Sequence, residues 1–165
     1  MISGVQCPIG RYGNTTGLTA DVDCSLCDPG YHCPQTGLTL PYAECSAGHY
    51  CELGAEAPNP NGETWGYHCP DGHYCPQGTP IPVPCDRGTY QPLEQRATEG
   101  DCIECEPGYY CLYSGRANVT DQCDEGYYCT RGAEVSNPTG IRRLLNVLVK
   151  SINKLYFNNY ITLAH

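Results

Sequence analysis

Large apolar side chains are distributed very unevenly along this chain. Residues 1–138 contain only sixteen Leu, Ile and Val and no Phe, whereas residues 139–165 contain ten Leu, Ile and Val. A segment with so few large apolar side chains cannot bury a conventional hydrophobic core. No apolar run in the sequence approaches the length that is needed to cross a bilayer. The pattern therefore divides the chain near residue 140, and the first part must be held together by something other than aliphatic packing.

The apolar positions of the C-terminal segment recur at helical spacing. They are Ile141, Leu144, Leu145, Leu148, Ile152 and Leu155, and the largely opposite positions hold Arg142, Arg143, Asn146, Lys150 and Lys154. This pattern predicts a basic amphipathic helix in residues 141–165, which would contact a membrane surface or a partner if the segment is genuine. The alternative, which we favour, is a gene-model artefact, because translation through an intron would change composition and periodicity together. It predicts a transcript with Cys in place of Val147 and Asn153.

A seven-residue frame, Cys-x-x-Gly-x-x-Cys, returns five times in the first part of the chain. These cassettes are residues 27–33, 45–51, 69–75, 105–111 and 123–129. In Asp28-Pro29-Gly30, Pro presets the first corner of a tight turn and Gly accepts the positive φ that a type II turn requires. A Tyr beside the Gly or the second Cys would cover the sulfur atoms; these residues are Tyr31, Tyr50, Tyr74, Tyr109 and Tyr128.

A longer period of 78 residues joins the cassettes into two units. The cysteines at 7, 24, 27, 33, 45 and 51 each have a counterpart 78 positions later, without a slip. The sequence predicts a cysteine-rich unit in residues 1–62, a bridging cassette in 63–84, a second unit in 85–140 and the basic tail in 141–165. Self-similarity at a fixed period is typical of a linear array in which each unit contacts its neighbours. We therefore expect a rod.

The fourteen cysteines decide the fold class and the compartment. An even number at regular spacing indicates a disulfide framework of the kind that small extracellular domains use in place of an apolar core. We expect a small disulfide-rich fold, an elongated tandem array of short β-hairpins and turns with little regular secondary structure. The expected location is extracellular, in a secreted protein or an ectodomain. Met1-Ile2-Ser3-Gly4 shows no signal peptide, which indicates that the sequence is a fragment.

The run Cys-x-x-Gly-x-Tyr, Asp-Cys-x-x-Cys, Cys-x-x-Gly-Tyr-x-Cys over residues 7–138 resembles the ephrin-receptor-like cysteine-rich repeat. That repeat belongs to the broader growth-factor-receptor cysteine-rich group, and the run is also similar to tumour-necrosis-factor receptor repeats. The resemblance implies an extracellular spacer or interaction segment of a larger secreted or membrane-anchored protein. It identifies no ligand-contact residue, because the matching positions are framework Cys, Gly, Pro and Tyr.

The disulfide pairing is predicted in two parts. Bridges Cys7–Cys24 and Cys85–Cys102 close the longer loop that opens each unit. For the cassettes, the similarity to tumour-necrosis-factor receptor repeats implies interlocked bridges, namely Cys27–Cys45, Cys33–Cys51, Cys105–Cys123 and Cys111–Cys129, with Cys69 closing on Cys75. The rival scheme bridges each cassette to itself and requires Cα separations below about 7 Å.

Other chemistry finds little support in the sequence. The Cys24-x-x-Cys27 and Cys102-x-x-Cys105 steps resemble zinc or redox motifs, but a metal would have to take four Cys from the disulfide ladder. His32, His49 and His73 lie beside Tyr in the cassettes, and Tyr replaces two of them 78 residues later, which favours packing over metal ligation. No catalytic or phosphate-binding motif is present, so we expect neither an enzyme nor a cofactor.

Candidate partners are narrowed but not identified. All eighteen acidic residues and only five Arg lie in residues 1–138, so no basic stripe exists for a nucleic acid. Sequons at Asn14 and Asn118 predict N-glycosylation in exposed loops. A structural spacer is favoured over a receptor-type module for a protein or glycan ligand, for which the insert around Trp65 is the nearest candidate site. A disulfide-rich inhibitor or effector is the third hypothesis.

Overall fold

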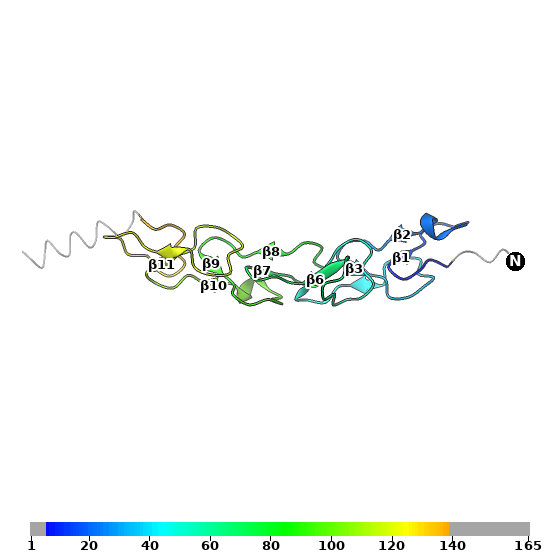
Figure 1. The fold of residues 1–165 in the computed structure, drawn as a ribbon, viewed down its shortest axis with the longest axis horizontal. Coiled ribbons are helices and arrows are strands. Elements are labelled where there is room, and N and C mark those ends of the chain that lie inside the picture. The colour runs from blue at the N-terminus through cyan, green and yellow to red at the C-terminus, as the bar shows by residue number, and fades with distance from the viewer. Residues whose placement is uncertain (1–5, 139–165) are drawn as a thin grey trace, which may run out of the picture.

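The computed structural model describes residues 6–138, which form an elongated rod with the first and last described residues at opposite ends (Figure 1). The interior of the rod is built mainly from cystine sulfur. Twelve of the fourteen cysteines are buried, and Tyr12, Ala55 and Pro60 are among the few other buried apolar side chains. The predicted fold class, a disulfide-rich array of short hairpins and turns, is therefore confirmed. The predicted helix in 141–165 lies outside the described residues.

Regular secondary structure is limited to six two-stranded antiparallel hairpins and two short 3-10 turns. Each hairpin pairs the second half of one tight turn with the residues just before the next. The pairs are β1 (Arg11–Tyr12) with β2 (Ser25–Leu26), β3 (Tyr31–His32) with β4 (Ala43–Glu44), β5 (His49–Cys51) with β6 (Gly66–His68), β7 (His73–Tyr74) with β8 (Val83–Pro84), β9 (Thr89–Tyr90) with β10 (Ile103–Glu104), and β11 (Tyr109–Tyr110) with β12 (Asp121–Gln122). The 3-10 turns are η1 (Asp21–Asp23) and η2 (Glu99–Asp101).

Seven segments of seven residues follow one another along the rod, and we call them rungs. They are residues 7–13, 27–33, 45–51, 69–75, 85–91, 105–111 and 123–129. Five are the predicted cassettes; in the other two, Gly13 and Gln91 stand where the second Cys would be. The central residue of every rung is a Gly with φ between 72° and 92°. In the rung at Gly30 the N–H of Tyr31 donates to the carbonyl of Asp28 over 3.0 Å, as in the predicted turn.

A two-residue turn follows each rung, and we call it the trailing turn. These turns are residues 17–18, 37–38, 54–55, 78–79, 95–96, 115–116 and 132–133, and the first residue of each has a positive φ. Six of these first residues are Gly, and the seventh is Gln95, with φ 61°. Gln95 is the only non-glycine residue of the described part with a positive φ, so its strained backbone is explained by its place in the series.

Successive rungs are joined by the same four backbone hydrogen bonds at all six steps of the rod. The central Gly donates to the last residue of the next rung and accepts from the first residue of that rung. The carbonyl of the first residue accepts from the trailing turn that belongs to the next rung, and the N–H of the last residue donates to that same turn. From rung 85–91 to rung 105–111, these bonds are Gly88 N–H to Cys111 O (2.9 Å), Cys105 N–H to Gly88 O (2.9 Å), Gly115 N–H to Cys85 O (2.8 Å) and Gln91 N–H to Arg116 O (2.9 Å).

Five of the seven disulfides close a rung onto itself, and the other two join rungs 7–13 and 85–91 to the loop that follows each of them. The bonds are Cys7–Cys24, Cys27–Cys33, Cys45–Cys51, Cys69–Cys75, Cys85–Cys102, Cys105–Cys111 and Cys123–Cys129. The pairs at 7–24, 69–75 and 85–102 agree with the prediction. The interlocked pairs Cys27–Cys45, Cys33–Cys51, Cys105–Cys123 and Cys111–Cys129 were wrong. The reason is geometric: the tight turn brings both cysteines of each rung within 5.8 to 6.2 Å at Cα, and backbone hydrogen bonds, not sulfur, connect neighbouring rungs.

The aromatic rings pack differently from the prediction at three positions. Tyr31 and Tyr109, directly after the central Gly, are 38% and 36% exposed, and Tyr128, in the last rung, is 49% exposed. The best-buried rings belong to residues one position later, two residues after the central Gly. Tyr12 packs with Cys27 and Cys33, and His32 is 5% exposed. Alternation along a strand explains the difference, because successive side chains point to opposite faces.

Candidate functional site

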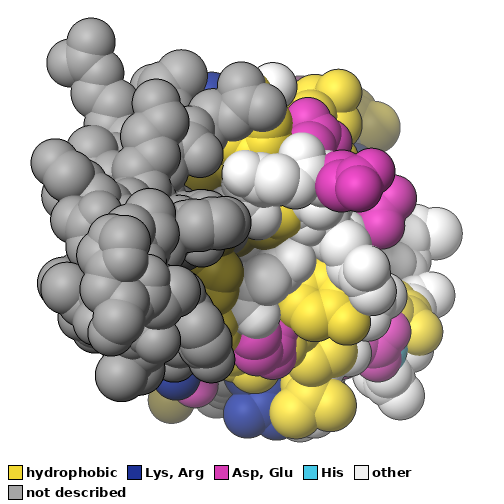
Figure 2. Space-filling model, turned by 90° about the vertical axis from the view of Figure 1, so that its left-hand side faces the viewer, with side chains coloured by type: hydrophobic (Ala, Val, Ile, Leu, Met, Phe, Trp, Pro, Cys, Tyr) yellow, Lys and Arg dark blue, Asp and Glu magenta, His cyan; other side chains and the backbone are white. Residues whose placement is uncertain are grey.

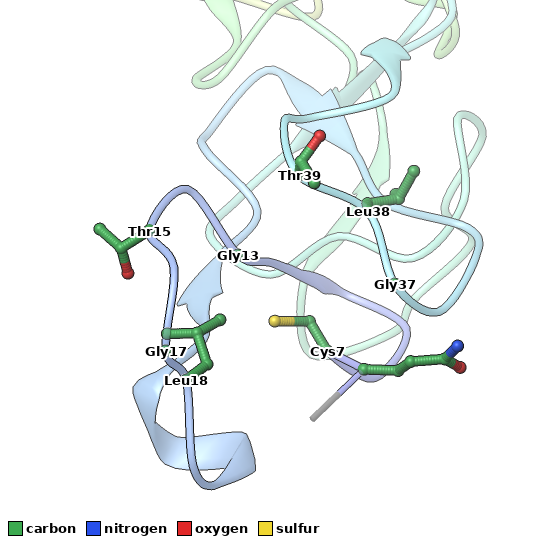
Figure 3. Close-up of a pocket in the computed structure, with 9 residues that line it drawn as sticks. Cys7, Gly13, Thr15, Gly17, Leu18, Gly37, Leu38 and Thr39 are labelled. Atoms are coloured by element: carbon green, nitrogen blue, oxygen red, sulfur yellow. The ribbon is translucent and has the colours of Figure 1, made fainter. Parts of the chain in front are cut away.

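A small cavity lies at the N-terminal end of the rod, and Figure 3 shows the residues around it. Its volume is about 230 Å³, and its lining contains no charged side chain. Leu18 and Cys7 face one another across it, while Thr15 points away (Figure 3). The lining residues are Gln6, Cys7, Gly13, Thr15, Gly17, Leu18, Gly37, Leu38 and Thr39.

Gly13 lines the cavity, but a Cβ there would lie 2.5 Å from Leu18 Cδ1 and 3.0 Å from Cys7 Sγ, so these two side chains already fill the space beside it. The residue 78 positions later is Gln91, whose side chain is 2% exposed and fills the interior of its rung. Its amide nitrogen donates to the carbonyl of Asp101, and its oxygen accepts from the N–H of Leu93 over 3.0 Å. The two units thus differ at this position, where Leu18 and Cys7 lie beside Gly13 in the first and the Gln91 side chain is buried in the second. The cavity offers neutral hydrogen-bonding groups and methyl groups but no nucleophile with an activating base.

The three histidines singled out in the sequence lie in three successive rungs. The His32 ring meets the edge of Tyr42 at 5.7 Å between centroids, and burial holds the pKa of His32 below its ordinary value. His49 is opposite His68 across β5 and β6, and His73 Nδ1 lies 2.8 Å from the carbonyl of Asp71. No group of three or more His, Cys, Asp or Glu within residues 6–138 is arranged to hold a metal ion.

Carboxylates on the rungs bind neighbouring hydroxyl and amide groups. Tyr12 donates to Asp28 over 3.2 Å, and Tyr90 donates to Glu106 over 2.6 Å in the corresponding place 78 residues later. The hydrogen bond from Tyr90 lowers the pKa of Glu106, while the same bond, burial and the Glu106 charge raise the pKa of Tyr90. The Glu106 carboxylate therefore stays ionised near neutral pH and accepts the hydrogen bond of Tyr90.

The acidic residue that closes each 3-10 turn has the same structural task in both units. Asp23 accepts from the N–H groups of Thr19 and Ala20 and from the Thr19 hydroxyl. Asp101 accepts from the N–H groups of Ala97 and Thr98 at the matching positions, and from the hydroxyl of Thr98, which stands one position later in its loop than Thr19 does. These hydrogen bonds, first of all those from the backbone of Thr19 and of Thr98, lower the pKa of both carboxyl groups. They position the loops that carry Cys24 and Cys102 to their partners.

Trp65 is not an exposed binding residue. Its ring is half-buried and packs against the cluster of Cys45, Cys51 and Ala55. The insert that contains it therefore extends the interior of one rung, where the rod has a longer connection between β5 and β6.

Both predicted glycosylation sites are on the surface. Asn14 and Asn118 are exposed, and Asn14 lies between two residues that line the cavity. The Thr120 hydroxyl of the second sequon accepts from the N–H of Leu112 over 2.9 Å. Glycan attachment at these residues remains a prediction.

Comparison with known proteins identifies no family for this chain, so its class is argued from the structure. No protein-family model matches the chain, and no curated protein sequence matches it. Within residues 6–138, no helix is long and apolar enough to cross a membrane. The seven disulfides and the absence of free cysteine define a disulfide-rich module of the kind found in oxidising, extracellular surroundings.

Proposed function

We propose that this chain is a non-catalytic, extracellular spacer: a stiff rod that holds apart the segments attached to its two ends. The observation that carries the proposal is the uniform step. Six consecutive steps use the same four backbone hydrogen bonds, whether the connection between rungs is long or short. Such a rod has one repeated geometry, and its length is set by the number of rungs.

The sulfur bridges support stiffness within each step. Five of the seven rungs are closed across their own turn, and the other two are anchored through Cys7–Cys24 and Cys85–Cys102. Most of the holding groups are backbone and sulfur, so surface side chains are free to vary without loss of the step. The resemblance to ephrin-receptor-like and tumour-necrosis-factor receptor repeats, which occur in extracellular arrays, is consistent with this role.

The binding-module alternative has weaker support. The cavity in Figure 3 and a second one of about 250 Å³ beside Arg11 and Asp21 are both smaller than the roughly 300–1,000 Å³ typical of small-molecule sites. Large exposed apolar side chains are scattered along the described chain from Ile9 to Val135. A disulfide-rich inhibitor would present one specialised loop, whereas here the same step recurs from end to end.

A deletion in register with the rungs tests the spacer proposal. Removing residues 45–68 deletes one rung with its trailing turn and joins Glu44 directly to Cys69, with every remaining disulfide pair intact. We expect small-angle X-ray scattering to show a folded rod with a reduced maximum dimension and an unchanged cross-section.

A matched control removes the same number of residues and the same two cysteines but disrupts the register. Deletion of residues 34–57 takes away the trailing turns at 37–38 and 54–55, so rung 7–13 loses its partner turn. This variant should misfold. If both deletions give the same outcome, or if the in-register deletion leaves the length unchanged, the spacer proposal is wrong.

A further inference from the structure

Three residues frame each close approach between a central Gly and the trailing turn two rungs ahead. The first precedes the central Gly, the second precedes the next rung, and the third precedes that trailing turn. We call each set of three a triplet, and such approaches occur at the first five rungs. The triplets are Ile9, Leu26 and Leu53; Pro29, Glu44 and Gln77; Ala47, His68 and Glu94; Asp71, Pro84 and Ser114; and Arg87, Glu104 and Arg131.

The second and third residues of a triplet lie side by side. In the third triplet, His68 Nε2 is 2.8 Å from Glu94 Oε2. In the first triplet, a Cβ on Gly54, the residue after Leu53, would lie 3.1 Å from Leu26 Cδ2. Wherever the trailing turn of a triplet starts with Gly, that Gly faces the second side chain of the triplet in the same way. The step therefore brings these two side chains together.

Among the five triplets, the first consists of large aliphatic side chains, whereas each of the other four contains a carboxylate. Ile9, Leu26 and Leu53 are 46%, 37% and 53% exposed. Ile9 adjoins the other two, because a Cβ on its neighbour Gly10 would lie 2.7 Å from the carbonyl oxygen of Gly54. Single exposed apolar side chains are ordinary, but three at one step indicate an interaction surface.

The second unit shows that the framework does not require this apolar surface. The corresponding triplet, 78 residues later, is Arg87, Glu104 and Arg131, and the rungs around it use the same backbone hydrogen bonds. Figure 2 looks along the rod from the end that carries the second unit, where hydrophobic, acidic and basic side chains are interspersed. The aliphatic residues of the first triplet are therefore not needed for the fold.

A carboxylate beside the first triplet lacks the cation that its counterpart has in the second unit. Glu134 Oε2 lies 3.8 Å from Arg87 Nε. The counterpart of Glu134 is Glu56, whose Cγ lies 3.2 Å from the Cβ position of Gly10. The residue at the place of Arg87 is Ile9, so Glu56 has no ion pair within residues 6–138.

A second carboxylate shows the same difference. The Tyr90 hydrogen bond and, to a smaller extent, the Arg131 charge lower the pKa of Glu106. Its counterpart in the first unit is Asp28, and the counterpart of Arg131 is Leu53. Asp28 therefore lacks that cationic neighbour.

The first unit has no other cation to supply. Arg11 is the single Lys or Arg in residues 6–84, and its guanidinium donates to the Cys24 carbonyl over 2.8 Å. Neither Asp28 nor Glu56 forms an ion pair within the described part of the chain. The first triplet thus combines an apolar centre with carboxylates whose charge is not neutralised.

We propose that the triplet of Ile9, Leu26 and Leu53 binds a partner protein through a segment that presents an apolar side chain flanked by Lys or Arg. The apolar side chain would cover the triplet, and the cations would lie beside the carboxylates, as Arg87 and Arg131 do in the second unit. An apolar centre with a polar rim is the common anatomy of protein interfaces. The inference goes beyond the spacer role, because it gives one step of the rod a binding task.

Binding of a defined peptide to the oxidised full chain tests this surface. The probe is a fluorescent amphipathic peptide of Leu and Lys, and the comparison peptide has Ser in place of every Leu at the same charge. We expect fluorescence anisotropy to show about tenfold tighter binding of the Leu/Lys peptide. Added salt should weaken its binding, because part of the attraction is between exposed charges.

A double variant, Ile9→Arg with Leu53→Arg, copies the second unit, so the framework accommodates both side chains. It should weaken binding of the Leu/Lys peptide about tenfold. The matched control is Leu93→Arg with Tyr113→Arg, which changes the net charge equally and removes two apolar side chains that are 55% and 60% exposed elsewhere. The control should lose clearly less affinity.

Leu26→Glu separates the apolar contribution from the charge. It copies Glu104 and makes the chain more acidic, so a purely electrostatic attraction to the Leu/Lys peptide would become stronger. We expect weaker binding instead, because the centre of the surface is no longer apolar. Circular dichroism without reduction checks that each variant is folded.

Four results would overturn the proposal. A wild-type chain that binds neither peptide has no such surface. Equal binding of the two peptides, or equal losses in the two double variants, would mean a general attraction of charge. Tighter binding by Leu26→Glu would exclude the apolar centre. If sedimentation shows that the wild-type chain dimerises and that Leu26→Glu abolishes the dimer, the occupant is a second copy.

Discussion

A Cβ atom on Gly88 would lie 2.5 Å from the carbonyl oxygen of Gly132, two rungs further along the rod. The rungs are stacked so closely that backbone touches backbone beyond the nearest neighbour, which leaves room for hydrogen only at the central position. The same residue needs a φ of 81°. Two separate physical demands, conformation and space, therefore select Gly there.

Substitutions at Gly88 and Gly108 separate these two demands. Both residues have a positive φ, 81° and 92°, but a Cβ on Gly108 has open space. Gly108→Ala should therefore destabilise the fold by about 1–2 kcal/mol, the usual cost of the left-handed region for a non-glycine residue. Gly88→Ala should cost clearly more, because the Gly132 carbonyl must also move. Thermal unfolding under non-reducing conditions measures both, and equal losses would contradict the close stacking.

Folding should depend on the bridges within the rungs. Closing a loop with the short Cys27–Cys33 separation contributes about 2 kcal/mol in the chain-entropy model, and the longer Cys7–Cys24 loop contributes about 3 kcal/mol. Full reduction with the thiols blocked should unfold residues 6–138, as monitored by circular dichroism and protease resistance. Peptide mapping without reduction should recover Cys27 linked to Cys33. Recovery of Cys27 linked to Cys45, or a fold that survives reduction, would contradict this account.

Burial of His32 should make the fold sensitive to mild acid. Its pKa is lowered in the folded state, chiefly by burial, so the unfolded chain binds the proton more readily. The stability that the neutral ring contributes is therefore present above the unfolded pKa of about 6.5 and is lost as the pH falls below it. His32→Tyr, which copies Tyr110 of the second unit, should flatten the melting temperature between pH 7.5 and 5. If the melting temperature of His32→Tyr falls with pH as steeply as that of the wild type, His32 is not the source of the acid sensitivity.

Gln91 should be a stabilising residue despite its polarity. Gln91→Gly copies Gly13 of the first unit, but it would leave the Asp101 carbonyl and the Leu93 N–H without their partner. We expect a loss of about 1–3 kcal/mol in the free energy of unfolding, measured in urea with the disulfides intact. Gln91→Glu keeps the acceptor for Leu93 and removes only the donor to Asp101, so its loss should be smaller. A Gln91→Gly chain as stable as the wild type would show that the buried amide contributes nothing.

The sequence predicted the parts of this fold that depend on local geometry. The Cys-x-x-Gly frame carries its own turn signal, so the turns and the positive φ of Gly30 and Gly108 could be predicted without a structure. The rod followed from the 78-residue period. The Cys7–Cys24 and Cys85–Cys102 pairs followed from their identical spacing.

The stacking could not be predicted, because it depends on contacts between segments that are distant in sequence. The rungs at 7–13 and 85–91 lack a second Cys and were not recognised as equivalent to the cassettes, although Gly10 and Gly88 stand three residues after a Cys as in every other rung. The sequence alone shows no backbone contact between neighbouring cassettes, so interlocked disulfides were predicted to connect them. The structure uses backbone hydrogen bonds for that connection.

Residue-resolved hydrogen exchange, measured by NMR on the oxidised chain, tests the stacked rod most directly. The account predicts slow exchange at the central glycine amides of the first six rungs, Gly10, Gly30, Gly48, Gly72, Gly88 and Gly108, because each donates to the following rung. Fast exchange at all six, with protection confined to amides bonded within single hairpins, would show that the rungs are independent loops and would contradict the rod.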